Sequence, residues 1–151
     1  MFRLTKKMIY ALEAVVDVAY NGRTGPVQSR DITRRQEIPQ RYLEQVMQQL
    51  VRAGILKGVR GPKGGYNLAR ERRRISVGEI VQVVNNMDLN KNKIDDLSTS
   101  PLGIKVINPL IENLNISIVK KLNEITLQDL CQQAMIEGVE TETTHDFTFI
   151  I

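Results

Sequence analysis

The sequence of 151 residues contains one cysteine, one histidine and no tryptophan. The single cysteine, Cys131, cannot form an intrachain disulfide, which indicates a reducing, intracellular setting. With His145 as the single histidine, the sequence offers no catalytic nucleophile–histidine–acid triad. It also contains neither the residue spacing of a metal site nor a phosphate-binding loop. We therefore expect a chain that is not an enzyme and that has no metal site.

Long apolar runs are also missing. The apolar stretch after Lys7 is interrupted by Glu13 and Asp17, unlike the core of a signal peptide. No uncharged run approaches the roughly 20 residues that a membrane span needs. We therefore expect a cytoplasmic protein with no membrane partner.

The charge of the chain is divided unevenly between its halves. Residues 1–86 contain 16 Lys and Arg against 7 Asp and Glu, whereas residues 87–151 contain 5 against 10. A basic first half favours a polyanion such as nucleic acid as its partner. A solvated surface of mixed charge could show the same asymmetry, so the motifs must decide.

Helical spacing of apolar residues predicts three helices in the basic half. The first covers 5–21 with Thr5 as its cap, and the second covers 29–36 with Ser29 as its cap. The third runs over 39–53, with its proline in a first helical position, and has one apolar and one polar face. Two short helices of this kind in succession are typical of a helix-turn-helix.

A hairpin follows over residues 55–69. Its turn, Arg60-Gly61-Pro62-Lys63-Gly64-Gly65-Tyr66, is tight and nearly free of side chains, so that it could lie against a nucleic-acid backbone. Arg60 and Lys63 would place positive charge at its tip, and a narrow A·T-rich minor groove attracts such charge. A plain hairpin with surface charges would look the same, but the position behind a helix-turn-helix favours a DNA-binding wing.

The remainder of the chain is predicted as follows. Ser76 and Glu79 form a capping box that opens a helix ending near residue 86, where the winged helix-turn-helix domain (1–86) ends. Residues 87–100 are a polar linker, and 101–138 contain two helices of a dimerisation extension, the second capped by Thr126 with Asp129. Residues 139–151 are a tail that ends in Phe147-Thr148-Phe149-Ile150-Ile151. This tail could dock on a partner or pack against its own chain. The fold class is mainly α with a small β-hairpin wing.

The polar face of the third predicted helix offers side chains that suit base edges. Arginine pairs with guanine, glutamine with adenine, and glutamate accepts from the cytosine amino group. A solvated helix face is the alternative explanation. The predicted phosphate contacts are Lys6, Lys7, Arg34, Arg35, Arg52 and the basic run 70–74. For Arg72, Arg73 and Arg74, a solvated loop is an equally good explanation.

Four blocks of the sequence closely resemble the Rrf-two family of bacterial transcription regulators, which includes iron–sulfur cluster and cysteine-metabolism regulators. They are Arg3-Leu4-Thr5, Tyr42-Leu43-Glu44-Gln45, Val59 to Tyr66 and Ser76-Val77-Gly78-Glu79-Ile80. The resemblance is dense over 1–86 and weak as far as Ile125-Thr126-Leu127. It implies a homodimer on a palindromic operator, with a long dimerisation helix at about 109–123. The predicted DNA-binding residues are Gln40, Arg41, Tyr42, Glu44, Gln45, Arg60, Lys63, Gly64 and Lys6.

Within that resemblance, Glu44 and Gln45 would read the major groove and Arg60 would enter the minor groove. One departure concerns cluster-binding members, which carry three closely spaced cysteines in the loop that corresponds to residues 87–105. This sequence has no cysteine there. Because thiolates are the usual cluster ligands, we expect no conventional cluster and no cofactor, and we expect Cys131 to be a buried apolar residue.

The predicted function is sequence-specific DNA binding by a homodimeric transcription regulator that acts as a repressor. Without a cluster, its effector is expected to be a protein partner or a small metabolite. The alternative is a winged-helix protein–protein interaction module regulated by a metabolic enzyme or metabolite. Such a module would be expected to lose Arg60 and the basic face, and this chain retains both.

Overall fold

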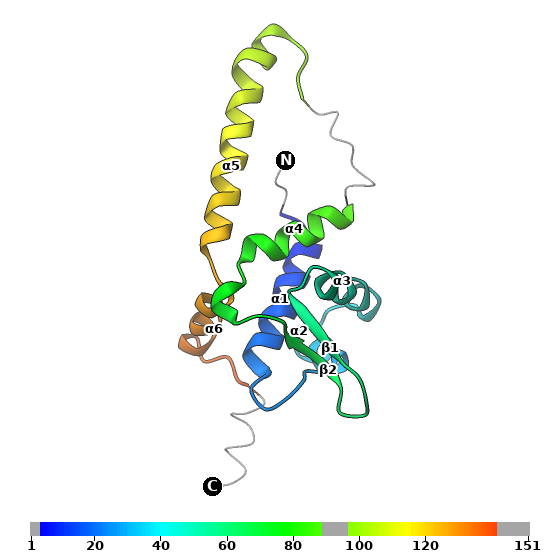
Figure 1. The fold of residues 1–151 in the computed structure, drawn as a ribbon. Coiled ribbons are helices and arrows are strands. Elements are labelled where there is room, and N and C mark those ends of the chain that lie inside the picture. Colours follow the sequence, from blue (N-terminus) through cyan, green and yellow to red (C-terminus); the bar gives the residue numbers. More distant parts are fainter. Residues whose placement is uncertain (1–3, 89–96, 142–151) are drawn as a thin grey trace.

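The computed structural model describes residues 4–88 and 97–141 (Figure 1). Its elements in chain order are α1 (Lys6–Asn21), α2 (Ser29–Gln36), α3 (Gln40–Arg52), β1 (Leu56–Val59), β2 (Gly65–Leu68), α4 (Val77–Asp88), α5 (Asn108–Glu124) and α6 (Leu127–Ile136). A 3-10 turn (Arg72–Arg74) precedes α4, and a π-helical segment (Gly103–Ile107) leads into α5. The predicted class, mainly α with a hairpin wing, is confirmed.

Three predicted helix caps are present. The Thr5 hydroxyl accepts a hydrogen bond from the Met8 N–H at 3.2 Å. The Ser76 hydroxyl accepts from the Glu79 N–H at 3.2 Å while the Glu79 carboxylate accepts from the Ser76 N–H at 2.9 Å. A second reciprocal pair, formed by Thr126 and Asp129, starts α6. These caps satisfy backbone donors that the first helical turns leave without partners.

Two predicted helix starts need correction. Ser29 does not cap α2, because Gln28 takes the N-cap position and makes no side-chain cap bond. Pro39 is the N-cap of α3 and not its first helical residue, with an extended backbone at φ −56° and ψ 127°. The left-handed Glu37 at φ 55° ends α2, so the left-handed residue and the proline together form the turn between the two helices.

The core lies around α1 and includes α6. From α1, it contains Ala11, Ala14, Val15 and Val18, which pack with buried residues of α3 and α4. Leu127 and Cys131 of α6 belong to this same core, with exposures of 0% and 3%. The backbone of Ile75 accepts from the Leu127 N–H at 2.9 Å, which fixes the start of α6 beside the start of α4. The predicted burial of Cys131 is therefore confirmed.

The two-stranded sheet is extended by one bridge. β1 and β2 pair antiparallel, with Leu56 opposite Leu68 and Val59 opposite Gly65. Val27, which precedes α2, exchanges backbone hydrogen bonds with Tyr66 at 2.9 and 2.8 Å. This bridge ties the wing to the start of the helix-turn-helix.

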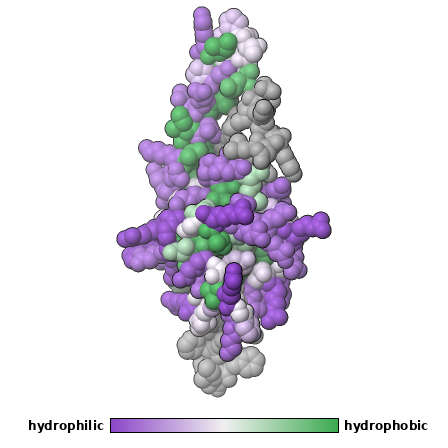
Figure 2. Space-filling model, turned by 45° about the vertical axis from the view of Figure 1, so that its right-hand side comes forward, coloured by the Kyte–Doolittle hydropathy of each residue, from purple (hydrophilic) through white to green (hydrophobic). Residues whose placement is uncertain are grey.

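Helix α5 projects away from the body formed by the other elements (Figure 1). None of its residues is buried, although it carries many apolar side chains. The exposed apolar residues of the π-helical segment and α5 are Ile104, Val106, Ile107, Leu110, Leu114, Ile116, Ile118 and Val119. They are visible as apolar patches over the upper part of Figure 2. We call this set the α5 apolar stripe.

Among the residues described, no helix combines the length and apolar character that crossing a membrane requires. Part of the predicted linker (89–96) and most of the predicted tail (142–151), with His145 and Phe147 to Ile151, lie outside the described residues.

Candidate nucleic-acid interface

Helix α3 presents one face to the core and the other to solvent. Its buried residues are Leu43, Val46, Met47 and Leu50. Between them, the side chains predicted to contact bases are exposed: Gln40, Arg41, Glu44 and Gln45. The amide of Gln40 donates to the Glu44 carboxylate at 3.4 Å. The 3.6-residue period therefore places the predicted base-reading side chains on the solvent-exposed face of α3.

Helix α2 is held against α1 by an ion pair that the sequence interpretation missed. The Asp17 carboxylate, which is fully buried, accepts from Arg35 Nε at 2.9 Å and from Arg35 Nη2 at 2.7 Å. Gln36 Nε2 donates to the same carboxylate at 2.8 Å. The structure thus turns Arg35 toward α1 and commits its guanidinium to Asp17, whereas the predicted phosphate contact of Arg35 stays a prediction.

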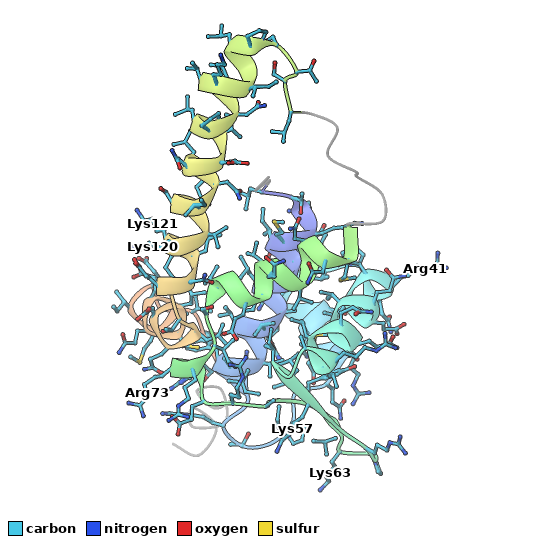
Figure 3. All side chains as sticks on the ribbon, turned by 45° about the horizontal axis from the view of Figure 1, so that its top comes forward. Arg41, Lys57, Lys63, Arg73, Lys120 and Lys121 are labelled. Atoms are coloured by element: carbon cyan, nitrogen blue, oxygen red, sulfur yellow. The ribbon has the colours of Figure 1, made fainter. Side chains whose placement is uncertain are left out.

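The wing turn is built so that only glycine fits at three positions, Gly61, Gly64 and Gly65. A Cβ on Gly64 would lie 2.2 Å from the carbonyl oxygen of Val59, and Gly64 is accordingly buried. Gly61 has φ 110°, a conformation that side chains rarely adopt. The Gly64 N–H donates to the Gly61 carbonyl at 2.9 Å, closing the turn. Arg60 and Lys63 remain exposed on it, and Figure 3 shows Lys63 at the tip of the wing.

A cleft of about 700 Å³ lies between the wing turn and the starts of α2 and α3. It brings together three predicted site residues, Gln40, Arg60 and Gly64, from different elements. Its wall also contains Gln28, Ser29 and Arg30, which were not predicted. The signal for them was available, because the N-terminus of a helix attracts phosphate and the exposed Arg30 adds a positive charge there.

The remaining predicted residues lie elsewhere on the domain. The Tyr42 hydroxyl donates to the Lys7 carbonyl at 2.8 Å, and the Tyr42 and Tyr10 rings lie 5.8 Å apart. Lys6 Nζ lies 5.1 Å from the centre of the Tyr10 ring. Tyr42 therefore joins α3 to the start of α1, which places Lys6 near α3.

Gln45 faces a second cleft, of about 600 Å³, between α3 and α4. This cleft also contains Gln48, Gln49 and Arg52 from α3, and Asn86 from α4. Exposed Lys57 on β1 is a further cation that was not predicted (Figure 3).

The basic run 70–74 is partly structural. Arg70 Nη2 lies 2.9 Å from the Glu79 carboxylate, and Arg70 Nη1 donates to the Arg74 carbonyl at 3.0 Å. Burial would raise the pKa of Glu79, but the hydrogen bonds from Ser76 and Arg70 outweigh it and hold that pKa below its ordinary value. Arg70 therefore positions the start of α4.

The other members of this run differ in exposure. Arg73 is largely exposed, with one loose ion pair to Glu71 at 3.7 Å. Arg72 lies beside Cys131, where burial raises the pKa of the thiol while the hydrogen bond and charge of Arg72 oppose that rise. A buried thiol held neutral is a poor nucleophile and a poor metal ligand.

The chain is similar to known transcription regulators over nearly its whole length. The profile of the Rrf2 family, described as an iron-dependent transcriptional regulator, matches residues 4–133. The HTH-type transcriptional regulator IscR of Escherichia coli is 36% identical over 95% of this chain and 90% of its own length.

Two solved structures share the fold. T. potens IscR has a TM-score of 0.73 and 32% identity, covering 95% of this chain and 96% of its own. The B. subtilis global cysteine regulator CymR has a TM-score of 0.68 and 26% identity, covering 88% and 98%.

Proposed function

Since this chain belongs to the Rrf2 family of transcriptional regulators, we propose that it represses transcription by binding a specific palindromic operator as a homodimer. It is a DNA-binding regulator with a winged-helix fold and not an enzyme. The observation that carries the proposal is the cleft in which Gln40 of α3, Arg60 of the wing and the start of α2 meet.

In this proposal α3 lies in the major groove. Glu44 and Gln45 contact base edges, with Gln40 and Arg41 beside them, because these exposed groups match the donors and acceptors of the major groove. The glycine turn lets the wing approach the backbone closely, so that Arg60 reaches the minor groove and Lys63 adds charge at its edge. Lys6 contributes a phosphate contact, and Tyr42 supports the helix that reads the bases.

The α5 apolar stripe supports the homodimer. Ile107, Leu110, Leu114 and Ile118 recur at intervals of three and four residues and are 40–52% exposed in the single chain. Such a stripe on a helix that projects from the body is typical of an interface with a second helix. A two-fold dimer would present two copies of α3 in opposite directions, which is why a palindromic operator is expected.

The residues present do not fit the iron–sulfur cluster of the cluster-binding family members. Such clusters are usually held by several thiolates, and this sequence has only Cys131. That residue is buried in α6, and no group of three potential metal ligands occurs among residues 4–88 and 97–141. We therefore propose a regulator without a conventional cluster, acting in the cytoplasm and controlled by a protein partner or a small metabolite.

Selection from a random duplex library tests this function. The full-length protein should enrich one palindromic sequence, and the purified complex should contain two chains per duplex. If no sequence is enriched, although the protein is folded, the proposal fails and the winged-helix protein–protein interaction module becomes the better explanation.

A further inference from the structure

A groove of about 890 Å³ lies between α1, the end of α2, α6 and the segment after α6. Its walls contain apolar side chains that are only half-buried, Leu12 and Val16 from α1 and Leu130 and Ala134 from α6. The Tyr20 hydroxyl donates to the Val139 carbonyl at 2.6 Å and holds the segment after α6 against α1. Pockets for organic ligands are typically about 300–1,000 Å³ and mostly apolar, and this groove has that character.

Carboxylates predominate among the charged groups of the groove. The carboxylates of its lining are Glu13, Asp17, Glu137 and Glu140, against the two guanidinium groups of Arg34 and Arg35. The Arg34 guanidinium lies 3.4 Å from the Asp31 carboxylate, which offsets its charge. The lining therefore carries an excess of negative charge beside an apolar surface.

The groove also touches the ion pair that holds α2. Asp17, Arg35 and Gln36 line one end of it. Arg35 and Gln36 are the last two residues of α2, and α3 starts four residues after Gln36. A molecule seated in the groove would contact α1 and α2 at once, and would thus act on the pair of helices that positions α3, the helix proposed to read bases.

We propose that this groove is an effector site for an amphipathic organic cation, with its apolar body against α1 and α6 and its positive charge toward Glu13 and Glu137. An anion of the same shape would meet carboxylates and is disfavoured. The lining contains no residue of α5, α3 or the wing, so that occupation leaves the proposed dimer and DNA surfaces uncovered. The regulatory part of this inference rests on the proposed function, whereas the binding part does not.

Two probes of nearly equal shape and opposite charge test the binding. Tetraphenylphosphonium and tetraphenylborate are each titrated into the full-length protein by isothermal calorimetry. We expect the phosphonium to bind with one site per chain and at least tenfold more tightly than the borate. Absence of binding, or equal binding of both ions, overturns the proposal.

Variants locate the site. The double variant Glu13→Gln/Glu137→Gln should weaken phosphonium binding about tenfold, whereas Glu124→Gln, an exposed carboxylate of α5 outside the groove, should leave it unchanged. Ala134→Trp should fill the groove and abolish binding, and its thermal unfolding is measured to show that it is folded. Equal effects of the groove and control variants would place the probe elsewhere and overturn the assignment.

A chain that ends at Thr141 tests another occupant. If the phosphonium binds this shortened chain but not the full-length one, the groove is filled by the chain's own C-terminal segment, and the effector proposal is overturned. Equal affinity of the two chains supports it.

The last measurement is the effect of the phosphonium on the affinity of the protein for the selected duplex. Saturating phosphonium should change the affinity of the protein for this duplex at least fivefold, and the Glu13→Gln/Glu137→Gln variant should not respond at the same probe concentration. Phosphonium binding without any change in DNA affinity overturns the regulatory role alone. Failure of the probe-free protein to bind any specific duplex instead counts against the proposed function.

Discussion

Arg35 and Asp17 form a bidentate ion pair between the last turn of α2 and the C-terminal half of α1. Arg35 Nε lies 2.9 Å from Asp17 Oδ2, and Arg35 Nη2 lies 2.7 Å from Asp17 Oδ1. The Asp17 side chain is completely buried and that of Arg35 is 17% exposed. This geometry matches the planar fork of a guanidinium to a carboxylate, so the pair specifies how α2 sits on α1.

Removing one partner of this ion pair should strongly destabilise the folded chain. Arg35→Met leaves the buried Asp17 carboxylate with Gln36 as its remaining side-chain donor, and should lower the free energy of unfolding by about 3–5 kcal/mol. The adjacent Arg34→Met is a matched control, because Arg34 is 65% exposed in its pair with Asp31 and should cost less than about 1 kcal/mol. Urea unfolding measures both, and equal losses would contradict the structural role given to Arg35.

The same ion pair could not be predicted from local sequence patterns, whereas the helix caps could. Thr5, Ser76 and Thr126 could be recognised as caps because each cap bonds a backbone group three residues away. Asp17 and Arg35 are 18 residues apart, and nothing in the local pattern of either distinguishes a buried pair from two surface charges. Arg35 was therefore interpreted as a phosphate contact.

The placement of α6 was unpredictable for a related reason. Its periodicity indicates a helix, but the packing partner of that helix depends on the backbone bonds that fix Leu127 beside Ile75. The sequence interpretation grouped α6 with α5, whereas Leu127 and Cys131 complete the core of the winged helix. The exposed face of α3 and the wing turn were predictable, because helical period and glycine geometry are local properties.

Glu79 should give the domain a pH-dependent stability. Its pKa is lowered in the folded chain, so its carboxylate stabilises the fold fully above the unfolded pKa of about 4.3, and this contribution disappears as the pH falls through the folded pKa. Glu79→Gln should therefore cost about 1 kcal/mol at pH 7, and the difference from wild type should shrink below about pH 4. Thermal unfolding across this pH range measures it.

Glu71→Gln is the control for that experiment, because the Glu71 carboxylate is exposed and lies 3.7 Å from Arg73. It should change stability little at any pH. A deficit of Glu79→Gln that stays constant from pH 7 to pH 3 would show that the charge of Glu79 is not what stabilises the start of α4.

Arg60→Ala should weaken binding to the selected duplex by tenfold or more, because it removes the cation proposed to enter the minor groove. Arg73→Ala removes the same charge from a largely exposed site away from the wing (Figure 3) and should have a much smaller effect. Fluorescence anisotropy at several salt concentrations measures both. If the two variants lose affinity equally, the wing contributes only net charge and its assignment is wrong.

Leu114→Asp should convert the proposed homodimer into a folded monomer. Leu114 is 52% exposed in the single chain and lies outside the winged-helix core, so the charge should disrupt only an interface formed by the α5 apolar stripe. Asn113→Asp places the same charge about 100° around the helix and serves as the control. Sedimentation equilibrium measures the mass, and circular dichroism verifies that the variant is folded.

The dimer and the DNA site are coupled in this experiment. A monomer can occupy only one half of a palindrome, so Leu114→Asp should also lose most of its affinity for the full duplex while binding a half-site about as well as the wild-type chain does. A variant that stays dimeric would remove α5 from the interface. A monomeric variant with full affinity for the palindrome would instead show that two-fold pairing does not determine operator binding.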